Sequence, residues 1–185
     1  MAETTILLVR HGETDWNAER RVQGKTDRPL NDTGRAQARA LSDQLAAVPL
    51  AAVYSSDLSR ALETARVVAY ARDLRVTPDA ELRERDFGTW EGLTDVEILE
   101  RFPESRTGPW GDAETREELE ARVLAALRRI SESHPGETVL VVTHGGPLRA
   151  MLAHVSGDGS GPIANCHVLE LAFRDGDFAR VDRAT

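Results

Sequence analysis

Two histidines end two similar segments of this sequence. Residues 6–12 (ILLVRHG) and residues 139–145 (VLVVTHG) each run from an apolar stretch directly into a His-Gly pair. The carboxyl ends of parallel strands in an open α/β sheet line one crevice, so His11 and His144 face the same pocket if the two strands are neighbours. A single histidine in this context is more often a buried, hydrogen-bonded residue, but the repetition favours a functional pair.

The residues around the two histidines are suited to a phosphate group. Arg10 precedes the first histidine, and Arg60 opens a predicted helix that follows another strand and turn. Guanidinium groups match phosphate oxygens in a bidentate geometry. Gly145 and Gly146 follow the second histidine, and Pro147 suits a first helical turn, so backbone N–H groups there could cradle an anion. We therefore expect a dianionic phosphate in this pocket.

Alternating apolar runs and helical patterns place these residues on an α/β fold. Residues 5–9 and 51–54 read as strands, and residues 33–48 and 59–73 read as helices, which favours a largely parallel sheet. Residues 119–130 carry an apolar helical stripe, and residues 138–142 form a run typical of a strand buried on both faces. The C-terminal residues predict a hairpin of 166–173 and 178–181 around Asp175-Gly176, whereas 102–113 reads as a loop.

Composition limits the class of protein. A chain of 185 residues suits one domain, here taken as 1–185. The net charge of -8 argues against a nucleic-acid partner. The single cysteine, Cys166, excludes an intramolecular disulfide and fits a reducing compartment. No apolar stretch is long enough to span a membrane, so we expect no membrane partner and a cytoplasmic location.

The segment 8–14 (LVRHGET) resembles the signature of the histidine phosphatase superfamily. The resemblance is to the branch that contains cofactor-dependent phosphoglycerate mutases and broad-specificity phosphatases. Other blocks follow in the family's order and extend the match over nearly the whole chain. They are Gly24, residues 29–31 (PLN), 33–34 (TG), 54–61 (YSSDLSRA), 82–84 (LRE), 87–92 (FGTWEG) and 143–146 (THGG).

The resemblance implies a fold and a mechanism. The fold is a three-layer α/β/α sandwich of the phosphoglycerate mutase-like type with a mostly parallel central sheet. His11 is the nucleophile, which attacks phosphorus in line and forms a phosphohistidine that water then hydrolyses. Arg10, Arg60 and His144 stabilise the transferring phosphoryl group, and the two arginines disfavour protonation of His11. Glu84 matches the residue that protonates the leaving group and later deprotonates water; from charge pattern alone it would belong to a solvated acidic run.

The resemblance also implies substrate contacts. Thr14, Asn17, Gln23 and Gly24 fall where family members contact the phosphoryl group or the ester, and Gly145 joins them through its backbone. Without the family, Thr14 and Asn17 would read as turn and capping residues. Structural roles are expected for Trp16, Trp90, His134, His154, His167 and Cys166.

No metal and no cofactor are expected. The acidic residues Asp79, Glu81, Glu84 and Asp86 match no ligand loop and read as acidic surface.

Several functions remain open on the sequence alone. The family's mutases are longer between the glutamate block and the second histidine and have an extended tail, whereas about fifty residues separate Trp90 from His144 here. We therefore predict a phosphatase, a hydrolase acting on small-molecule phosphate esters. The alternatives are a cofactor-dependent phosphoglycerate mutase, a phosphoprotein phosphatase and a non-catalytic phospholigand sensor. Residues 102–113 and 157–165 are expected to shape the leaving-group pocket, but neither the physiological ester nor the oligomeric state follows from the sequence.

Overall fold

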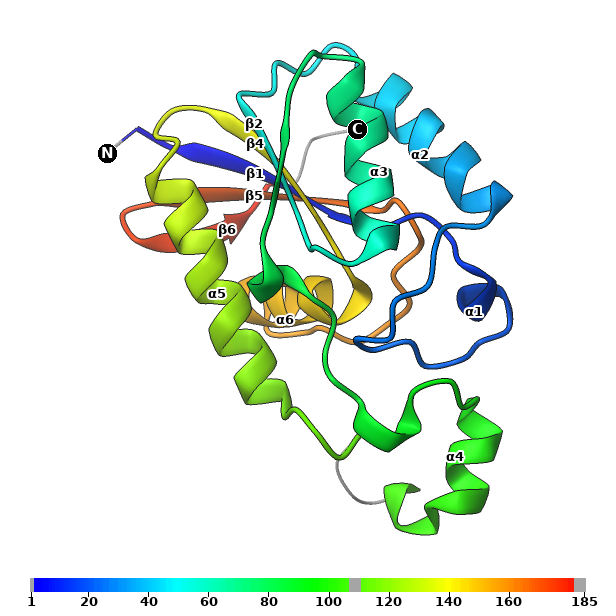
Figure 1. Cartoon of the computed structure of the whole chain (residues 1–185). Helices are drawn as coiled ribbons and strands as arrows, with labels where there is room; N and C mark the ends of the chain where they lie inside the picture. The colour runs from blue at the N-terminus through cyan, green and yellow to red at the C-terminus, as the bar shows by residue number, and fades with distance from the viewer. Residues whose placement is uncertain (1, 107–110, 182–185) are drawn as a thin grey trace.

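One mixed sheet runs through the centre of the molecule. A computed structural model describes residues 2–106 and 111–181, and within them the strand order is β3-β2-β4-β1-β5-β6 (Figure 1). The strands β3, β2, β4 and β1 are parallel, and β5 and β6 add an antiparallel hairpin at one edge. The bounds are β1 (Thr4–Arg10), β2 (Ala52–Ser55), β3 (Val76–Pro78), β4 (Thr138–Thr143), β5 (Val168–Arg174) and β6 (Asp177–Arg180). The predicted α/β class with a mostly parallel sheet is confirmed.

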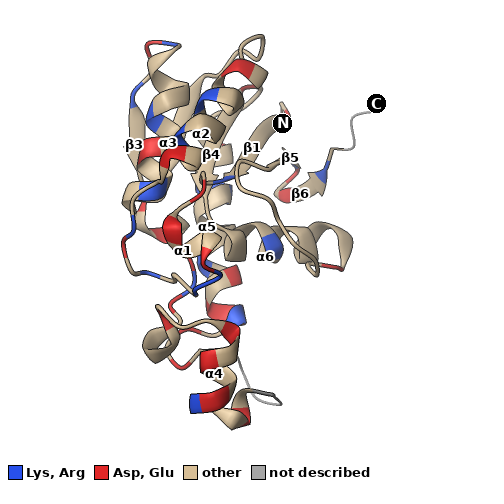
Figure 2. Ribbon diagram, turned by 90° about the vertical axis from the view of Figure 1, so that its right-hand side faces the viewer, with Lys and Arg blue, Asp and Glu red and all other residues tan. Residues whose placement is uncertain are grey.

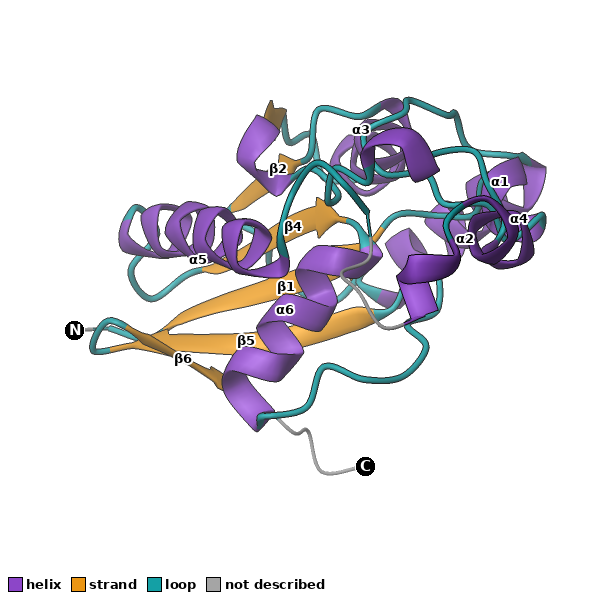
Figure 3. Cartoon of the chain, turned by 90° about the horizontal axis from the view of Figure 1, so that it is seen from below, coloured by secondary structure: helices purple, strands orange, loops and turns teal. Residues whose placement is uncertain are grey.

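Helices cover both faces of the sheet and complete the three layers (Figure 3). The main helices are α2 (Asp32–Gln44), α3 (Ser59–Tyr70), α5 (Arg116–Glu132) and α6 (Gly145–Ser156). Leu7 and Val9 of β1 pack in one core with α2 and α3, whereas Ile6 and Leu8 pack in a second core with α5 and α6. Because successive strand residues point to opposite faces, a strand that is apolar on both faces is buried between two helical layers.

Local chemistry explains where the helices begin. The side chain of Asn31 accepts a hydrogen bond from the Gly34 amide and caps α2. Thr115 and Glu118 form a capping box that begins α5. The helix predicted over 33–48 ends at Gln44, and the one predicted over 59–73 ends at Tyr70.

The chain leaves the sheet between β3 and α5 and returns after a long excursion. This excursion contains η1 (Ala80–Leu82), η2 (Gly88–Trp90), α4 (Asp95–Arg101) and η3 (Pro103–Arg106), and α4 stands away from the sheet (Figures 1 and 2). The loop predicted over 102–113 therefore contains a 3₁₀ turn, and its residues 107–110 lie outside the described residues. A bridge between Arg21 and Thr94 ties the excursion to the segment that follows α1 (Asp15–Ala18).

The predicted C-terminal hairpin is present. Asp175 and Gly176 both have positive φ angles, of 54° and 87°, which suits the tight turn between β5 and β6.

Across residues 2–106 and 111–181, we find no helix whose length and apolar character would let it cross a membrane.

Candidate active site

The sheet brings the two histidines together. Strands β1 and β4 are parallel neighbours in which Arg10 pairs with Thr143, so the next residue of each strand is a histidine. The ring centroids of His11 and His144 are 5.1 Å apart, in an edge-to-face arrangement. The amide of His11 also donates to the carbonyl of Thr143 at 2.9 Å, which extends the strand pairing to the site itself.

His11 is a neutral imidazole with one nitrogen already engaged. Its Nδ1 lies 2.6 Å from the carbonyl oxygen of Gly12, and because a carbonyl only accepts, Nδ1 carries the hydrogen. The lone pair therefore resides on Nε2. Burial, followed by the charges of Arg60 and Arg10, holds the pKa of His11 well below the ordinary value of 6.5. At neutral pH the ring is uncharged and able to act as a nucleophile.

Arg60 is fully buried and fixes the second histidine. Its Nε donates to Nδ1 of His144 at 3.2 Å, and its two terminal nitrogens donate to the carbonyls of Thr26 and Gly24 at 2.9 and 2.7 Å. The hydrogen of His144 therefore lies on Nε2, which donates to the hydroxyl of Ser56 at 2.8 Å. Burial lowers the pKa of Arg60 to about 10, so the guanidinium stays charged at neutral pH.

His144 is neutral as well. Burial, then the charge of Arg60, holds its pKa well below the ordinary value. At neutral pH both ring nitrogens are therefore engaged with protein groups, Nδ1 as an acceptor from Arg60 and Nε2 as a donor to Ser56. A positive charge on His144 would require a proton taken up beside a bound dianion.

Arg10 carries an unsatisfied donor. One of its terminal nitrogens, Nη1, donates to the carbonyl of Ile163, whereas its Nε is buried without a hydrogen-bond partner among the described residues. A buried N–H group without a partner is costly, and a phosphate oxygen would satisfy it.

The carboxylate of Glu84 lies at the N-terminus of α6. Its carboxylate oxygens accept from the amide of Gly146 at 3.1 and 3.0 Å, and one of them also accepts from the amide of Arg85 at 2.8 Å. The N-terminus of α6, where we expected a bound anion, therefore holds the carboxylate of Glu84. Gly145, which we expected to contact the substrate through its backbone, is buried and does not line the cavity that His11 and Glu84 share.

A cavity of about 790 Å³ opens in front of these residues. Arg10, His11, Arg60 and Glu84 all line it, whereas His144 is next to His11 but is not part of the lining. Of the residues expected to contact substrate, those at its wall are Asn17, Gln23 and Gly24. Thr14 lies elsewhere, because its hydroxyl caps α1 and donates to Oε1 of Gln23 at 2.8 Å.

The cavity wall contains arginines that the sequence blocks did not indicate. They are Arg20, Arg21, Arg85, Arg116 and Arg149, so that seven arginines and three acidic residues line the cavity within the described part of the chain. Gly159 and Ser160 also line it, as expected of the segment 157–165, whereas no described residue of 102–113 does. Arg149 had one available signal, since it lies one helical turn after Gly145.

The other acidic residues of the run 79–86 do not form a cluster with Glu84. Asp79 caps η1 and pairs with Arg129, and Asp86 pairs with Lys25. Over residues 2–106 and 111–181, no group of three or more His, Cys, Asp or Glu side chains is placed to hold a metal ion.

Comparisons with known proteins agree with this geometry. The family model of the histidine phosphatase superfamily (branch 1) matches residues 6–183. Phosphoglycerate mutase-like protein 4 of Arabidopsis thaliana is 41% identical, over 93% of this chain and 80% of that protein. A metal-independent phosphoserine phosphatase of the same plant is 38% identical, over 93% and 77% of the two chains. The structure of YhfR from Bacillus stearothermophilus superposes with a TM-score of 0.87 and 38% identity, over 96% of this chain and 95% of the other.

The chain belongs to the histidine phosphatase superfamily, and its fold is phosphoglycerate mutase-like. Its relatives place it among the phosphoric monoester hydrolases.

Proposed function

We propose that this protein hydrolyses small phosphate monoesters in two steps, with Nε2 of His11 as the nucleophile. The observation that supports this most directly is the state of His11. The ring is neutral, its Nδ1 is committed to Gly12, and it lines a cavity shared with Arg10, Arg60 and Glu84.

In the first step, Nε2 of His11 bonds to phosphorus while the bond from phosphorus to the ester oxygen breaks. The departing oxygen takes a proton from the carboxyl group of Glu84, which lines the same cavity as His11. Arg10 and Arg60 stabilise the charge that spreads over the three equatorial oxygens, because this transition state is loose and depends mainly on positioning and electrostatics.

In the second step, water attacks the phosphorus of the phosphohistidine. The carboxylate of Glu84 takes a proton from that water, the bond from phosphorus to Nε2 breaks, and inorganic phosphate leaves. His11 returns to its neutral form, and Glu84 is protonated again for the next cycle.

The size of the cavity supports a small substrate over a phosphoprotein. About 790 Å³ lies within the range of roughly 300–1,000 Å³ typical of small-molecule sites. A relative named a metal-independent phosphoserine phosphatase supports the same substrate size and a reaction that needs no metal. The free thiol of Cys166 supports the proposed cytoplasmic location.

Mutase activity is the main alternative, because the relatives include a protein named a 2,3-bisphosphoglycerate-dependent phosphoglycerate mutase. Both reactions would pass through the phosphohistidine and differ in the acceptor, which is water in one and a phosphoglycerate in the other. Assays with 3-phosphoglycerate, with and without 2,3-bisphosphoglycerate, distinguish them. We expect release of inorganic phosphate, and conversion to 2-phosphoglycerate without release would reject hydrolysis.

The covalent step is tested by brief incubation with a ³²P-labelled phosphate ester followed by quenching. We expect acid-labile label on the wild-type protein and none on His11→Ala. Label retained by His11→Ala would place the nucleophile at another residue.

A further inference from the structure

Arg122 of α5 uses its whole guanidinium group on the segment that carries Glu84. Its Nη1 donates to the carbonyls of Glu81 and Arg83 at 2.7 and 2.8 Å, and its Nη2 donates to the carbonyl of Glu84 at 2.9 Å. Its Nε and Nη2 also donate to the two carboxylate oxygens of Glu114, at 2.6 and 3.0 Å. A guanidinium has five N–H donors, and these five hydrogen bonds use all of them.

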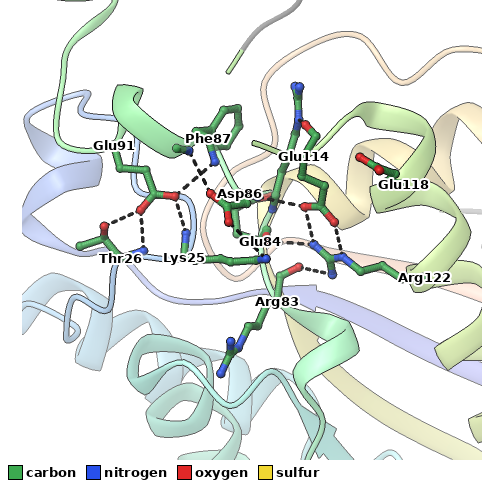
Figure 4. Close-up of polar contacts among 12 residues, drawn as sticks. Lys25, Thr26, Arg83, Glu84, Asp86, Phe87, Glu91, Glu114, Glu118 and Arg122 are labelled. Atoms are coloured by element: carbon green, nitrogen blue, oxygen red, sulfur yellow. Dashed lines mark hydrogen bonds and ion pairs between the residues drawn. The ribbon is translucent and has the colours of Figure 1, made fainter. Parts of the chain in front are cut away.

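Glu114 fastens the far end of the same segment. Its carboxylate accepts from the amide of Asp86 at 2.9 Å (Figure 4). Its backbone amide donates to the carbonyl of Asp86 at 3.1 Å, and its backbone carbonyl accepts from Nε of Arg85 at 2.6 Å. Only 15% of the Arg122 side chain and 11% of the Glu114 side chain are exposed. Removal of one partner would leave a largely buried charge unpaired, so both are needed to hold the arrangement.

The segment is also supported at its two ends, where the Thr143 hydroxyl donates to the carbonyl of Leu82 at 2.6 Å and the Phe87 amide donates to Glu91 at 3.2 Å. Residues 84–87 lie between η1 and η2 and have no regular secondary structure. The backbone of Glu84 is held from α5 by Arg122, while its carboxylate is held from α6 by Gly146. Proton transfer requires the carboxyl group within hydrogen-bond reach of the ester oxygen, and small displacements from that geometry are costly.

We propose that Arg122, braced by Glu114, is the positioning residue for Glu84 and thereby controls protonation of the leaving group. Arg122 does not line the cavity, so it acts through Glu84 and not on the substrate. This inference rests on the role of Glu84 proposed above, and the experiment is designed to separate the two.

The test compares two esters that differ in their need for a proton. The phenolate of p-nitrophenyl phosphate leaves without one, whereas the alkoxide of glycerol 2-phosphate requires one. The informative quantity is kcat/KM, because it covers the steps up to departure of the leaving group and excludes hydrolysis of the phosphohistidine.

For Arg122→Gln we expect kcat/KM to fall by about 10- to 100-fold with glycerol 2-phosphate and by less than about threefold with p-nitrophenyl phosphate. Equal losses on the two esters would overturn the proposal, and so would unchanged kinetics on both. Arg128→Gln is the matched control, since Arg128 is exposed on the same helix and the change in charge is identical. The control should leave both values unchanged.

Glu84→Gln separates this inference from the proposed function. If Glu84→Gln itself fails to discriminate between the esters, the assignment of Glu84 as proton donor is wrong. If Glu84→Gln discriminates and Arg122→Gln does not, only the role of Arg122 is wrong. The double variant should lose no more activity on glycerol 2-phosphate than Glu84→Gln alone, because both changes remove the same proton transfer. A further loss of tenfold or so would mean that Arg122 acts by another route.

Arg122→Lys and Glu114→Gln provide the same comparison if Arg122→Gln does not fold. Lysine keeps the charge but offers three donors in place of five. Each should impair the alkyl ester more than the aryl ester, and equal impairment in both variants would again overturn the proposal.

Discussion

The tautomers of the two histidines follow from their immediate partners. A carbonyl at Nδ1 of His11 and a guanidinium at Nδ1 of His144 leave no alternative placement for either hydrogen. One ring thus offers a lone pair at Nε2, while the other donates its Nε2 hydrogen to Ser56. The same burial that fixes these states also keeps both rings neutral.

We expect the stability of the protein to fall as the pH drops below 6.5. The folded-state pKa of each ring is depressed, so the unfolded chain takes up protons near pH 6.5 that the folded chain cannot. Their stabilising contribution is present above that pH and is lost as the pH falls towards the folded-state pKa values. Between pH 6.5 and the folded-state pKa, each ring lowers the free energy of unfolding by up to about 1.4 kcal/mol for each unit by which the pH falls.

Urea unfolding at pH 7.5 and pH 5.5 measures this effect. His11→Gln and His144→Gln should each show a smaller loss of unfolding free energy between the two pH values than the wild type. Identical losses in all three proteins would contradict neutral buried rings.

The sequence predicted the residues that matched family blocks, and the structure brings the five catalytic candidates together. It did not indicate Arg122, because the guanidinium of that residue contacts three backbone carbonyls, and a carbonyl leaves no trace in the residue type. Thr14 illustrates the opposite case, in which the ordinary capping interpretation describes the position observed.

At the scale of elements, the loop of residues 24–26 connects two charged side chains. Its backbone amides at Lys25 and Thr26 donate to the carboxylate of Glu91 at 2.8 Å each (Figure 4). Its carbonyls, at Gly24 and Thr26, hold Arg60. Gly24 has a φ of 52°, and a Cβ there would lie 1.8 Å from the Glu91 carboxylate, so the loop requires glycine at this position.

Glu91→Ala should therefore weaken the binding of phosphate. Without the carboxylate, the carbonyls that orient Arg60 lose their support, and we expect the inhibition constant of inorganic phosphate to rise by roughly tenfold. Gly24→Ala should give the same result by displacing the Glu91 side chain. Glu100→Ala on α4, an exposed position, is the control. An unchanged inhibition constant in Glu91→Ala would show that the loop holds Arg60 unaided.

The long elements were predictable from their apolar patterns, whereas the short elements β3 and α4 were not. β1 and β4 have uninterrupted apolar runs, and α5 has a buried stripe with a capping box at its start. β3 has three residues and ends in a proline, and α4 has seven residues, too few for either periodicity to emerge. Tertiary contacts with the rest of the chain determine such elements.

At the scale of the whole molecule, the charge of the cavity opposes that of the chain. The net charge is -8, and acidic side chains lie on several elements, including α4 (Figure 2). Among the charged residues that line the cavity in the described part of the chain, arginines instead outnumber acidic residues by seven to three. A cleft with one sign of charge attracts ligands of the opposite sign and raises the rate of productive encounter.

We expect kcat/KM for a phosphate ester to decrease several-fold as sodium chloride rises from about 20 to about 300 mM, because screening shortens the reach of the cavity's field. The value of kcat should change much less, since it describes bound substrate. Arg116→Gln should reduce this salt sensitivity, whereas Arg128→Gln should not. A kcat/KM that is independent of salt in the wild type would exclude steering.

The pairing of β1 with β4 has a consequence for how this molecule can diversify. The hydrogen-bonded pairing of β1 with β4 fixes the spacing of the two imidazoles. This pairing lies in the close-packed interior and tolerates little change. Part of the cavity wall comes from the excursion between β3 and α5. Hydrogen bonds hold its residues 84–91 in place, whereas the part that contains α4 stands away from the sheet and can accept insertions and replacements more readily. Variants with a changed α4 segment should therefore hydrolyse phosphate esters of other alcohols while retaining His11 as the nucleophile.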